Sequence, residues 1–168
     1  SDFARMPKPI FKDNKLVLII TENIKLLNEL DNDIEIDFSF ENKKIIFNSD
    51  YEQLSRVFFN LIKNAIESIQ EKSNQSSDFE KKINIKIIDN KDKIMFSVID
   101  NGIGFENFEG NIKDILNPYF TTKKKGTGLG LSIVNKIIND HDGSIDFIPL
   151  DIGAKIEIMF LKKWVMKY

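Results

Sequence analysis

The stretch DYEQLSRVFFNLIKNAIESIQE, residues 50–71, has the most regular pattern in the chain. Asp50 stands directly before its apolar positions and Gln53 follows three residues later, a combination typical of the start of an α-helix. The apolar residues recur every three or four positions, as one face of a helix requires. They are Leu54, Val57, Phe58, Leu61, Ile62, Ala65, Ile66 and Ile69. The stretch therefore predicts an amphipathic helix that covers a hydrophobic core.

The opposite face of this helix carries Asn60, Asn64 and Glu67. At 100° per residue these three side chains lie within about 60° of one another. Asn carbonyl oxygens are hard ligands that suit Mg²⁺ beside nucleotide phosphates. A polar helix face is also an ordinary solvated surface, so the triplet alone leaves both interpretations open.

The segments around this helix predict a mixed fold. Apolar and polar residues alternate strictly in residues 33–40, as in a strand with one buried face, and we expect residues 44–48 to form its short partner strand. Other expected elements are helices at 14–30 and 129–139, a hairpin of strands at 83–89 and 93–100, and strands at 144–148 and 154–161. This order favours an α+β fold, a two-layer sandwich with a mixed, mostly antiparallel sheet and helices packed on one face.

The composition excludes several kinds of site. The 168 residues include no Cys and one His, which removes disulfides, thiolate metal sites and multi-histidine metal centres. Lys and Arg number 24 against 26 Asp and Glu, and the net charge of −2 argues against a nucleic-acid partner. No apolar run approaches the roughly 20 residues that cross a bilayer, so we expect no direct membrane contact and a reducing compartment.

The pattern predicts one domain with two short ends. Residues 1–13 contain Pro7 and Pro9, which disfavour helix in the residues before them and predict an extended linker. Residues 14–161 carry all the expected helices and strands, and residues 162–168 form a tail.

A turn with two glycines, DNGIG at residues 100–104, follows the second strand of the expected hairpin. An ionised carboxylate such as Asp100 only accepts hydrogen bonds, so it suits a ligand that donates, such as an exocyclic amine. Gly102 and Gly104 would let a planar ring approach the backbone. The same residues also make an ordinary hairpin turn, and both interpretations stay open.

A second glycine-rich segment, NPYFTTKKKGTGLGLSIV at residues 117–134, leads into a helix. Gly126, Gly128 and Gly130 precede that helix directly, where free backbone N–H groups and the helix dipole attract an anion. The glycine spacing fits neither a P-loop nor a dinucleotide-binding fingerprint. A flexible connector with solvated lysines is the alternative interpretation.

Together and in this order, the segments resemble the N, G1, F and G2 boxes of the ATP-binding catalytic domain of sensor histidine kinases. The similar stretches are NLIKNAIESI at 60–69, DNGIGF at 100–105, PYFTTK at 118–123 and GTGLGLSIV at 126–134. The same superfamily includes gyrase, MutL and the heat-shock chaperone ATPases. The resemblance covers about residues 14–161 and implies the Bergerat-type α+β fold.

The resemblance implies ATP and Mg²⁺ as ligands and gives particular residues a role. Asn64 would ligate Mg²⁺ beside the phosphates, with Asn60 one helical turn away assisting it, and these two would be the catalytic residues. Asp100 would accept a hydrogen bond from the adenine amino group, and residues 107–125 would form a lid. The other implied ATP-binding residues are Gly102, Gly104, Phe120, Lys123, Gly126, Thr127, Gly128, Leu129 and Gly130.

The residue at position 60 bears on the reaction. The gyrase-like ATPases have a glutamate at the corresponding place that activates water, whereas Asn60 cannot act as a general base at neutral pH. The resemblance therefore implies a kinase that donates the γ-phosphoryl group of ATP to a histidine on a separate dimerisation domain, with the receiver domain of a response regulator downstream. A nucleotide-gated binding module without phosphotransfer is the alternative, and a gyrase- or MutL-type ATPase is less favoured.

The single histidine, His141, is not expected to accept phosphate. It lies in HDGSI, similar to the His-Gly-Gly turn of the family, and the acceptor motif of the family is absent. We expect a turn residue, and a chain that does not autophosphorylate on its own. The first residues, SDFARMPKP, resemble the segment after the dimerisation helices of NtrY-type nitrogen-regulation sensor kinases. This implies a cytoplasmic domain whose parent protein is anchored in the bacterial inner membrane.

Overall fold

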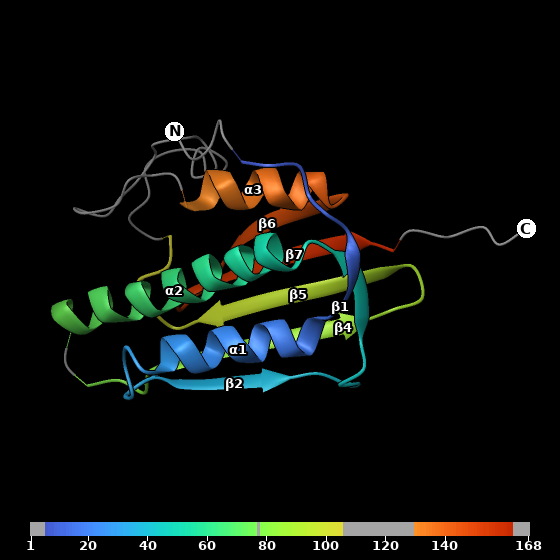
Figure 1. Cartoon of the computed structure of the whole chain (residues 1–168). Helices are drawn as coiled ribbons and strands as arrows, with labels where there is room; N and C mark the ends of the chain where they lie inside the picture. Colours follow the sequence, from blue (N-terminus) through green and yellow to red (C-terminus); the bar gives the residue numbers. More distant parts are fainter. Residues whose placement is uncertain (1–5, 77, 106–129, 163–168) are drawn as a thin grey trace, which may run out of the picture.

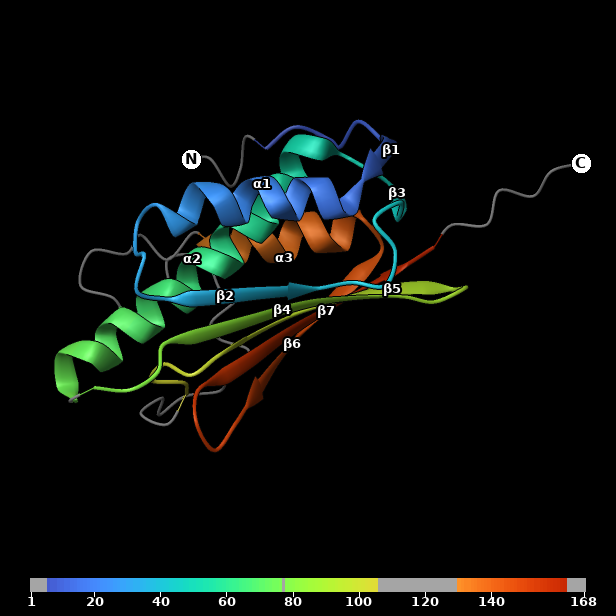
Figure 2. The same cartoon turned by 90° about the horizontal axis from the view of Figure 1, so that it is seen from below.

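The computed structural model describes residues 6–76, 78–105 and 130–162. These residues form two layers, a five-stranded sheet and three helices packed on one of its faces (Figures 1 and 2). A separate two-stranded sheet joins β1 to β3 beside the start of α1. In chain order the elements are β1 (Lys12–Lys15), α1 (Leu16–Asn28), β2 (Glu35–Ser39), β3 (Ile46–Ser49), α2 (Tyr51–Gln75), β4 (Lys82–Asp89), β5 (Lys93–Asp100), α3 (Gly130–Asp140), β6 (Gly143–Pro149) and β7 (Ala154–Leu161).

The strands of the main sheet lie in the order β2, β4, β5, β7, β6. β2 runs parallel to β4, and the other neighbouring strands are antiparallel. The predicted α+β sandwich with a mixed, mostly antiparallel sheet is therefore confirmed, as is the hairpin of β4 and β5.

The helix α2 lies at the centre of the core. All eight apolar positions predicted for its inner face are buried. Beneath it, Ile94, Phe96 and Val98 of β5 are buried while the residues between them are half-buried, as a two-residue period requires. The rings of Phe58 and Phe96 pack with centroids 4.7 Å apart. Each fully buried large apolar side chain of this kind stabilises the fold by about 1.5–3 kcal/mol.

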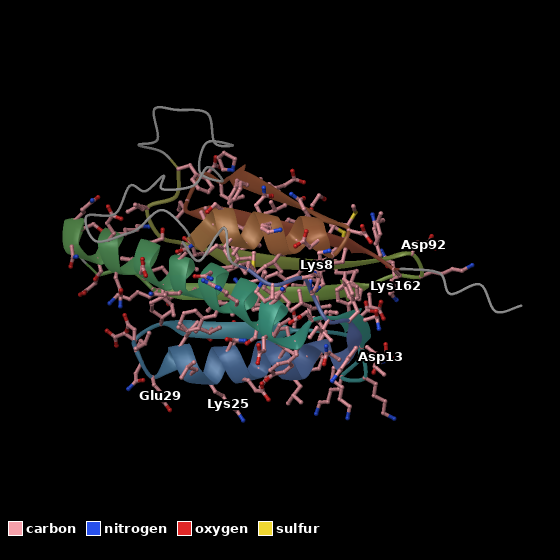
Figure 3. All side chains as sticks on the ribbon, turned by 45° about the horizontal axis from the view of Figure 1, so that its top comes forward. Lys8, Asp13, Lys25, Glu29, Asp92 and Lys162 are labelled. Carbon is pink, nitrogen blue, oxygen red and sulfur yellow. The ribbon has the colours of Figure 1, made fainter. Side chains whose placement is uncertain are left out.

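The outer side of α1 is exposed and carries both charged and apolar side chains, Leu18 and Leu26 among the latter. Lys25 of α1 and Glu29, the residue that follows the helix, point away from the sheet (Figure 3). Across the described part of the chain, no helix combines the length and the apolar character of a membrane span.

The start of α2 confirms one half of the predicted capping pattern. Asp50 is the N-cap, and its Oδ1 accepts a hydrogen bond from the backbone N–H of Gln53 at 3.0 Å. The side chain of Gln53 does not return to Asp50 but donates to the carbonyl oxygen of Pro7 at 2.9 Å. The helix also continues to Gln75, beyond the predicted end at 71, because the sequence EKSNQ contains no Gly or Pro to stop it.

Two predictions about the first 50 residues need correction, one in its bounds and one in its strand partner. The helix predicted at 14–30 is confirmed as α1, but it ends at Asn28 and begins only at Leu16, because Lys12–Lys15 pairs antiparallel with β3. The strand predicted at 44–48 exists as β3, but its partner is β1, and β2 pairs with β4 instead. Main-chain hydrogen bonds to a distant segment hold this strand. Such bonds need no particular side chains, so the sequence KDNK shows no apolar alternation that would have predicted it.

Candidate functional site

Asp100 lies at the end of β5 with only 6% of its surface exposed. Its Oδ1 accepts a hydrogen bond from the backbone N–H of Gly102 at 2.9 Å, and the Ser68 hydroxyl donates another to the carboxylate. Burial raises the pKa of the Asp100 carboxyl from 3.8 to about 6, although these two donors and the charge of Lys72 lower it. The end of β5 thus carries a buried carboxylate whose negative charge is only partly offset by its hydrogen-bond donors and by Lys72.

The glycines after Asp100 are required by close packing. A Cβ at Gly102 would lie 2.3 Å from Ser68 Oγ, so this residue contacts α2 through its bare backbone. Gly104 has φ +64° and faces the carbonyl oxygen of Gly153, which a Cβ would approach to 2.5 Å. The loop is therefore held between α2 on one side and the β6–β7 turn on the other.

Asn60 lies on the half-buried side of α2, opposite the start of α3. Its Nδ2 donates to the carbonyl oxygen of Arg56 at 2.9 Å, which leaves Oδ1 as the outward acceptor. A Cβ at Gly130, the first residue of α3, would lie 3.4 Å from that oxygen. The structure thus brings the predicted site residues Asn60 and Gly130 together.

One side of α2 connects this contact to Asp100. Asn60, Asn64 and Ser68 follow one another at intervals of four residues, so they lie along one strip of the helix about 12 Å long. Gly130 is at one end of the strip, and the loop after Asp100 is at the other. An elongated ligand along this strip would meet a carboxylate at one end and amides with a helix N-terminus at the other.

Two further residues of the site were missed by the sequence analysis. Ser68 contacts both Asp100 and Gly102, and Lys72 one turn later donates to the carbonyl oxygen of Asn101 at 3.0 Å. The Lys72 ammonium also lies 4.5 Å from the centroid of the Phe79 ring. The signal that could have found them is the continued spacing of four residues beyond Asn64.

A cavity of about 340 Å³ opens beside this loop. Lys72, Gly102 and Phe105 line it from the side of α2 and the loop, and the β6–β7 turn closes the other side. Its volume is at the lower end of the range of small-molecule sites.

Part of the predicted site lies outside the described residues. This holds for the lid expected at 107–125 and for Phe120, Lys123, Gly126, Thr127, Gly128 and Leu129.

His141 is buried in the turn between α3 and β6, with 2% of its surface exposed. Its Nδ1 lies 2.8 Å from the carbonyl oxygen of Ile137, and its Nε2 accepts from the backbone N–H of Asp50 at 3.1 Å. Asp142 takes φ +56°, the left-handed conformation that glycine adopts more easily. His141 therefore lies in a turn, as predicted, and both ring nitrogens have backbone partners.

Known proteins are similar to this chain in sequence and in fold. Residues 49–163 match the sequence profile of the family described as "Histidine kinase-, DNA gyrase B-, and HSP90-like ATPase". A putative sensor histidine kinase NtrY-like from Rickettsia bellii (strain RML369-C) is 35% identical over 159 residues, which are 94% of this chain. These residues make up 25% of that relative, so the chain spans about a quarter of its length.

Solved structures agree with this match. The catalytic domain of histidine kinase ThkA superposes with a TM-score of 0.76 at 30% identity, covering 91% of this chain and 96% of that chain. Histidine kinase ThkA in complex with response regulator protein TrrA gives a TM-score of 0.72 at 25% identity, covering 92% of this chain and 42% of that chain.

Proposed function

Because this chain belongs to the histidine kinase-, DNA gyrase B-, and HSP90-like ATPase family and has the fold of a histidine kinase catalytic domain, we propose that it transfers the γ-phosphoryl group of ATP to a histidine on a dimerisation domain. The observation that carries the proposal is the strip on α2, with a buried carboxylate at one end and Asn60, Asn64 and Gly130 at the other. ATP has the matching order of groups, an amine-bearing base at one end and phosphates at the other.

We assign the base of ATP to the Asp100 end of the strip. The carboxylate already takes two donors, from Gly102 and Ser68, and a carboxylate has about four acceptor positions. The adenine amino group would supply a further donor there. Gly102 lines the cavity beside this loop together with Lys72 and Phe105, and the planar ring would lie there.

We assign the phosphates and Mg²⁺ to the Asn60 end. Asn60 uses its Nδ2 on Arg56, so its carbonyl oxygen is presented toward the start of α3, and such a hard oxygen fits Mg²⁺. Asn64, one turn along, would be the principal ligand. Mg²⁺ bound there would neutralise phosphate charge, and the N-terminus of α3 would add its free N–H groups. The lid at 107–125, with Phe120, Lys123, Gly126, Thr127, Gly128 and Leu129, belongs to the same proposal.

We propose transfer in preference to hydrolysis because Asn60 is not a general base. Transfer then depends on in-line positioning and charge stabilisation, which the two helices supply. The acceptor domain would belong to the same parent protein, and a response regulator would act downstream, as the complex of ThkA with TrrA supports. The relative from Rickettsia bellii supports an NtrY-type parent, and we place this domain, residues 14–161, in the cytoplasm, where ATP is available.

Mixing the chain with the separately produced dimerisation domain of a close relative tests the proposal. With γ-³²P-ATP and Mg²⁺ we expect acid-labile, base-stable label on the histidine of that domain. The Asn64→Ala variant should give none, and Lys63→Ala, which changes an exposed neighbour, should match the unmodified chain. If ATP binds but no label transfers, the chain is a nucleotide-gated binding module and the proposal is wrong.

A further inference from the structure

Asp50, the N-cap of α2, joins three separate parts of the chain. Its backbone N–H donates to His141 Nε2 at 3.1 Å, in the turn after α3. Its Oδ1 accepts from Gln53 N of its own helix at 3.0 Å. Its Oδ2 accepts from the backbone N–H of Ile10 at 2.8 Å. One residue therefore links the start of α2, the end of α3 and the segment that leads into the domain.

The contacts of His141 fix the tautomer and the orientation of its ring. Because Nε2 accepts from the Asp50 N–H, this nitrogen carries no proton, and Nδ1 must be the nitrogen that donates to the carbonyl oxygen of Ile137. The ring packs edge-on against Phe11 with centroids 5.2 Å apart. A neutral imidazole with this tautomer satisfies both partners, and no aliphatic side chain could.

The hydrogen bond between Asp50 and His141 forms a junction between α2 and α3, and the lead-in segment, residues 7–15, contacts both of its residues. Gln53 Nε2 donates to the carbonyl oxygen of Pro7 at 2.9 Å, Ile10 donates to Asp50, and Phe11 packs on His141. Figure 1 shows this segment passing the end of α3 and the start of α2 before it forms β1. A displacement of the lead-in segment therefore acts on both partners of the Asp50–His141 hydrogen bond.

The junction and the nucleotide end of the site lie at opposite ends of one antiparallel helix pair. Asp50 and Asn60 are ten residues apart on α2, or about 15 Å. Gly130 and His141 are eleven residues apart along α3 and its first following residue, or about 16 Å. Because these two distances are nearly equal, the Asp50–His141 hydrogen bond and the approach of Gly130 to Asn60 belong to the same axial position of α3 along α2.

We propose that His141 is a positioning residue for phosphoryl transfer. Its hydrogen bond to Asp50 fixes the axial position of α3 against α2, and through this bond the lead-in segment controls how the start of α3 faces Asn60 and Asn64. The role in transfer rests on the proposed function, whereas the control of helix position does not.

Two substitutions of His141 separate its bonds. His141→Gln keeps an acceptor near the place of Nε2, so the Asp50 N–H stays bonded. His141→Asn keeps a donor near Ile137 but leaves the Asp50 N–H without its acceptor. The first measurement is NMR of the free chain without nucleotide. A coupling should be seen through the hydrogen bond between the Asp50 amide nitrogen and His141 Nε2. His141→Asn should shift the amide resonances of Asn60, Asn64 and Gly130, whereas His141→Gln should leave them in place.

The second measurement is transfer to the added dimerisation domain. His141→Asn should lower kcat about tenfold or more with KM for ATP changed less than about twofold, because Asp100 is far from the junction and a small misplacement of reacting groups is costly. His141→Gln should stay within about threefold of the unmodified chain. If His141 only stabilised the fold, His141→Asn would lower the folded fraction, and the protein that stays folded would keep the kcat and KM of the unmodified chain.

If His141→Asn does not fold, Phe11→Ala at the partly exposed side of the junction takes its place, with Leu26→Ala on the exposed side of α1 as the matched control. Phe11→Ala should move the Asp50, Asn60 and Asn64 resonances and Leu26→Ala should not. Unmoved resonances at Asn60 and Asn64 in a folded junction variant overturn the proposal, whatever the transfer assay gives. If the resonances move but the unmodified chain transfers no phosphoryl group, the helix junction stands and the kinase proposal fails.

Discussion

The backbone N–H of Gly102 donates to the Asp100 carboxylate at 2.9 Å, and the same glycine lies against Ser68 of α2. Asp100 is therefore held by its own loop on one side and by the central helix on the other. This arrangement fixes a buried acceptor in place before any ligand arrives, which is the kind of preorganisation that a selective base-binding site needs.

Replacing Asp100 by Asn should weaken ATP binding by about 1–3 kcal/mol, because it exchanges one acceptor of a buried pair for a group that can donate. Calorimetry of the two proteins with ATP and Mg²⁺ measures the difference. Equal affinities would remove Asp100 from the adenine site.

The same substitution should alter how stability depends on pH. The Asp100 pKa rises from 3.8 to about 6 on folding, so the folded chain binds this proton more tightly than the unfolded chain. The stabilising contribution is complete below pH 3.8 and is lost as the pH rises to about 6. At 1.36 kcal/mol for each of the roughly 2.2 pH units between these values, the loss is about 3 kcal/mol.

Asp100→Asn lacks this titration. Urea unfolding at several pH values compares the free energies of unfolding of the two proteins. The unmodified chain should lose stability relative to Asp100→Asn between pH 4 and 6, and the difference between the two should stay constant above pH 6. A constant difference between the two proteins across the whole pH range would show that folding does not raise the pKa of the Asp100 carboxyl.

Gly153→Ala should destabilise the domain by at least about 1–3 kcal/mol, the usual cost of a strained left-handed residue. Gly153 has φ +80°, and a Cβ there would stand 1.8 Å from the carbonyl oxygen of Asp100. Gly130→Ala is the matched control, because its Cβ would meet nothing closer than 3.4 Å. Thermal unfolding compares the two, and equal midpoints would contradict the close packing of the β6–β7 turn on the Asp100 strand end.

Asn64→Ala should abolish the dependence of triphosphate binding on Mg²⁺, because it removes the principal oxygen ligand. A Mg²⁺ titration of ATP affinity measures this, with Lys63→Ala as the control on the exposed neighbouring position. An unchanged titration in Asn64→Ala would place the metal elsewhere.

The chain alone should not label itself with γ-³²P-ATP. His141 is buried, and both ring nitrogens have backbone partners, so neither is available as a nucleophile. Acid-labile phosphate on His141 would show that this turn opens in solution.

The sequence predicted what local periodicity encodes. The buried face of α2 and the hairpin of β4 and β5 were found because their apolar residues repeat at the helical or strand period. The pairing of β1 with β3 was missed because main-chain hydrogen bonds between segments about 35 residues apart need no particular side chains.

The site shows the same division. Asp100 and Asn60 were found as members of motifs. Ser68 and Lys72 continue the four-residue spacing of Asn60 and Asn64, but their roles come from contacts with the folded loop. The hydrogen bond between Asp50 and His141 joins positions 91 residues apart, and no pattern in either segment indicates it.

The most direct test of the central claim follows both fates of the γ-phosphoryl group in one reaction. With γ-³²P-ATP, Mg²⁺, the chain and an added dimerisation domain, label should accumulate as phosphohistidine on that domain while free phosphate stays at the level seen without it. Release of free phosphate at the same rate with and without the dimerisation domain, and no phosphohistidine, would contradict the account and identify an ATPase.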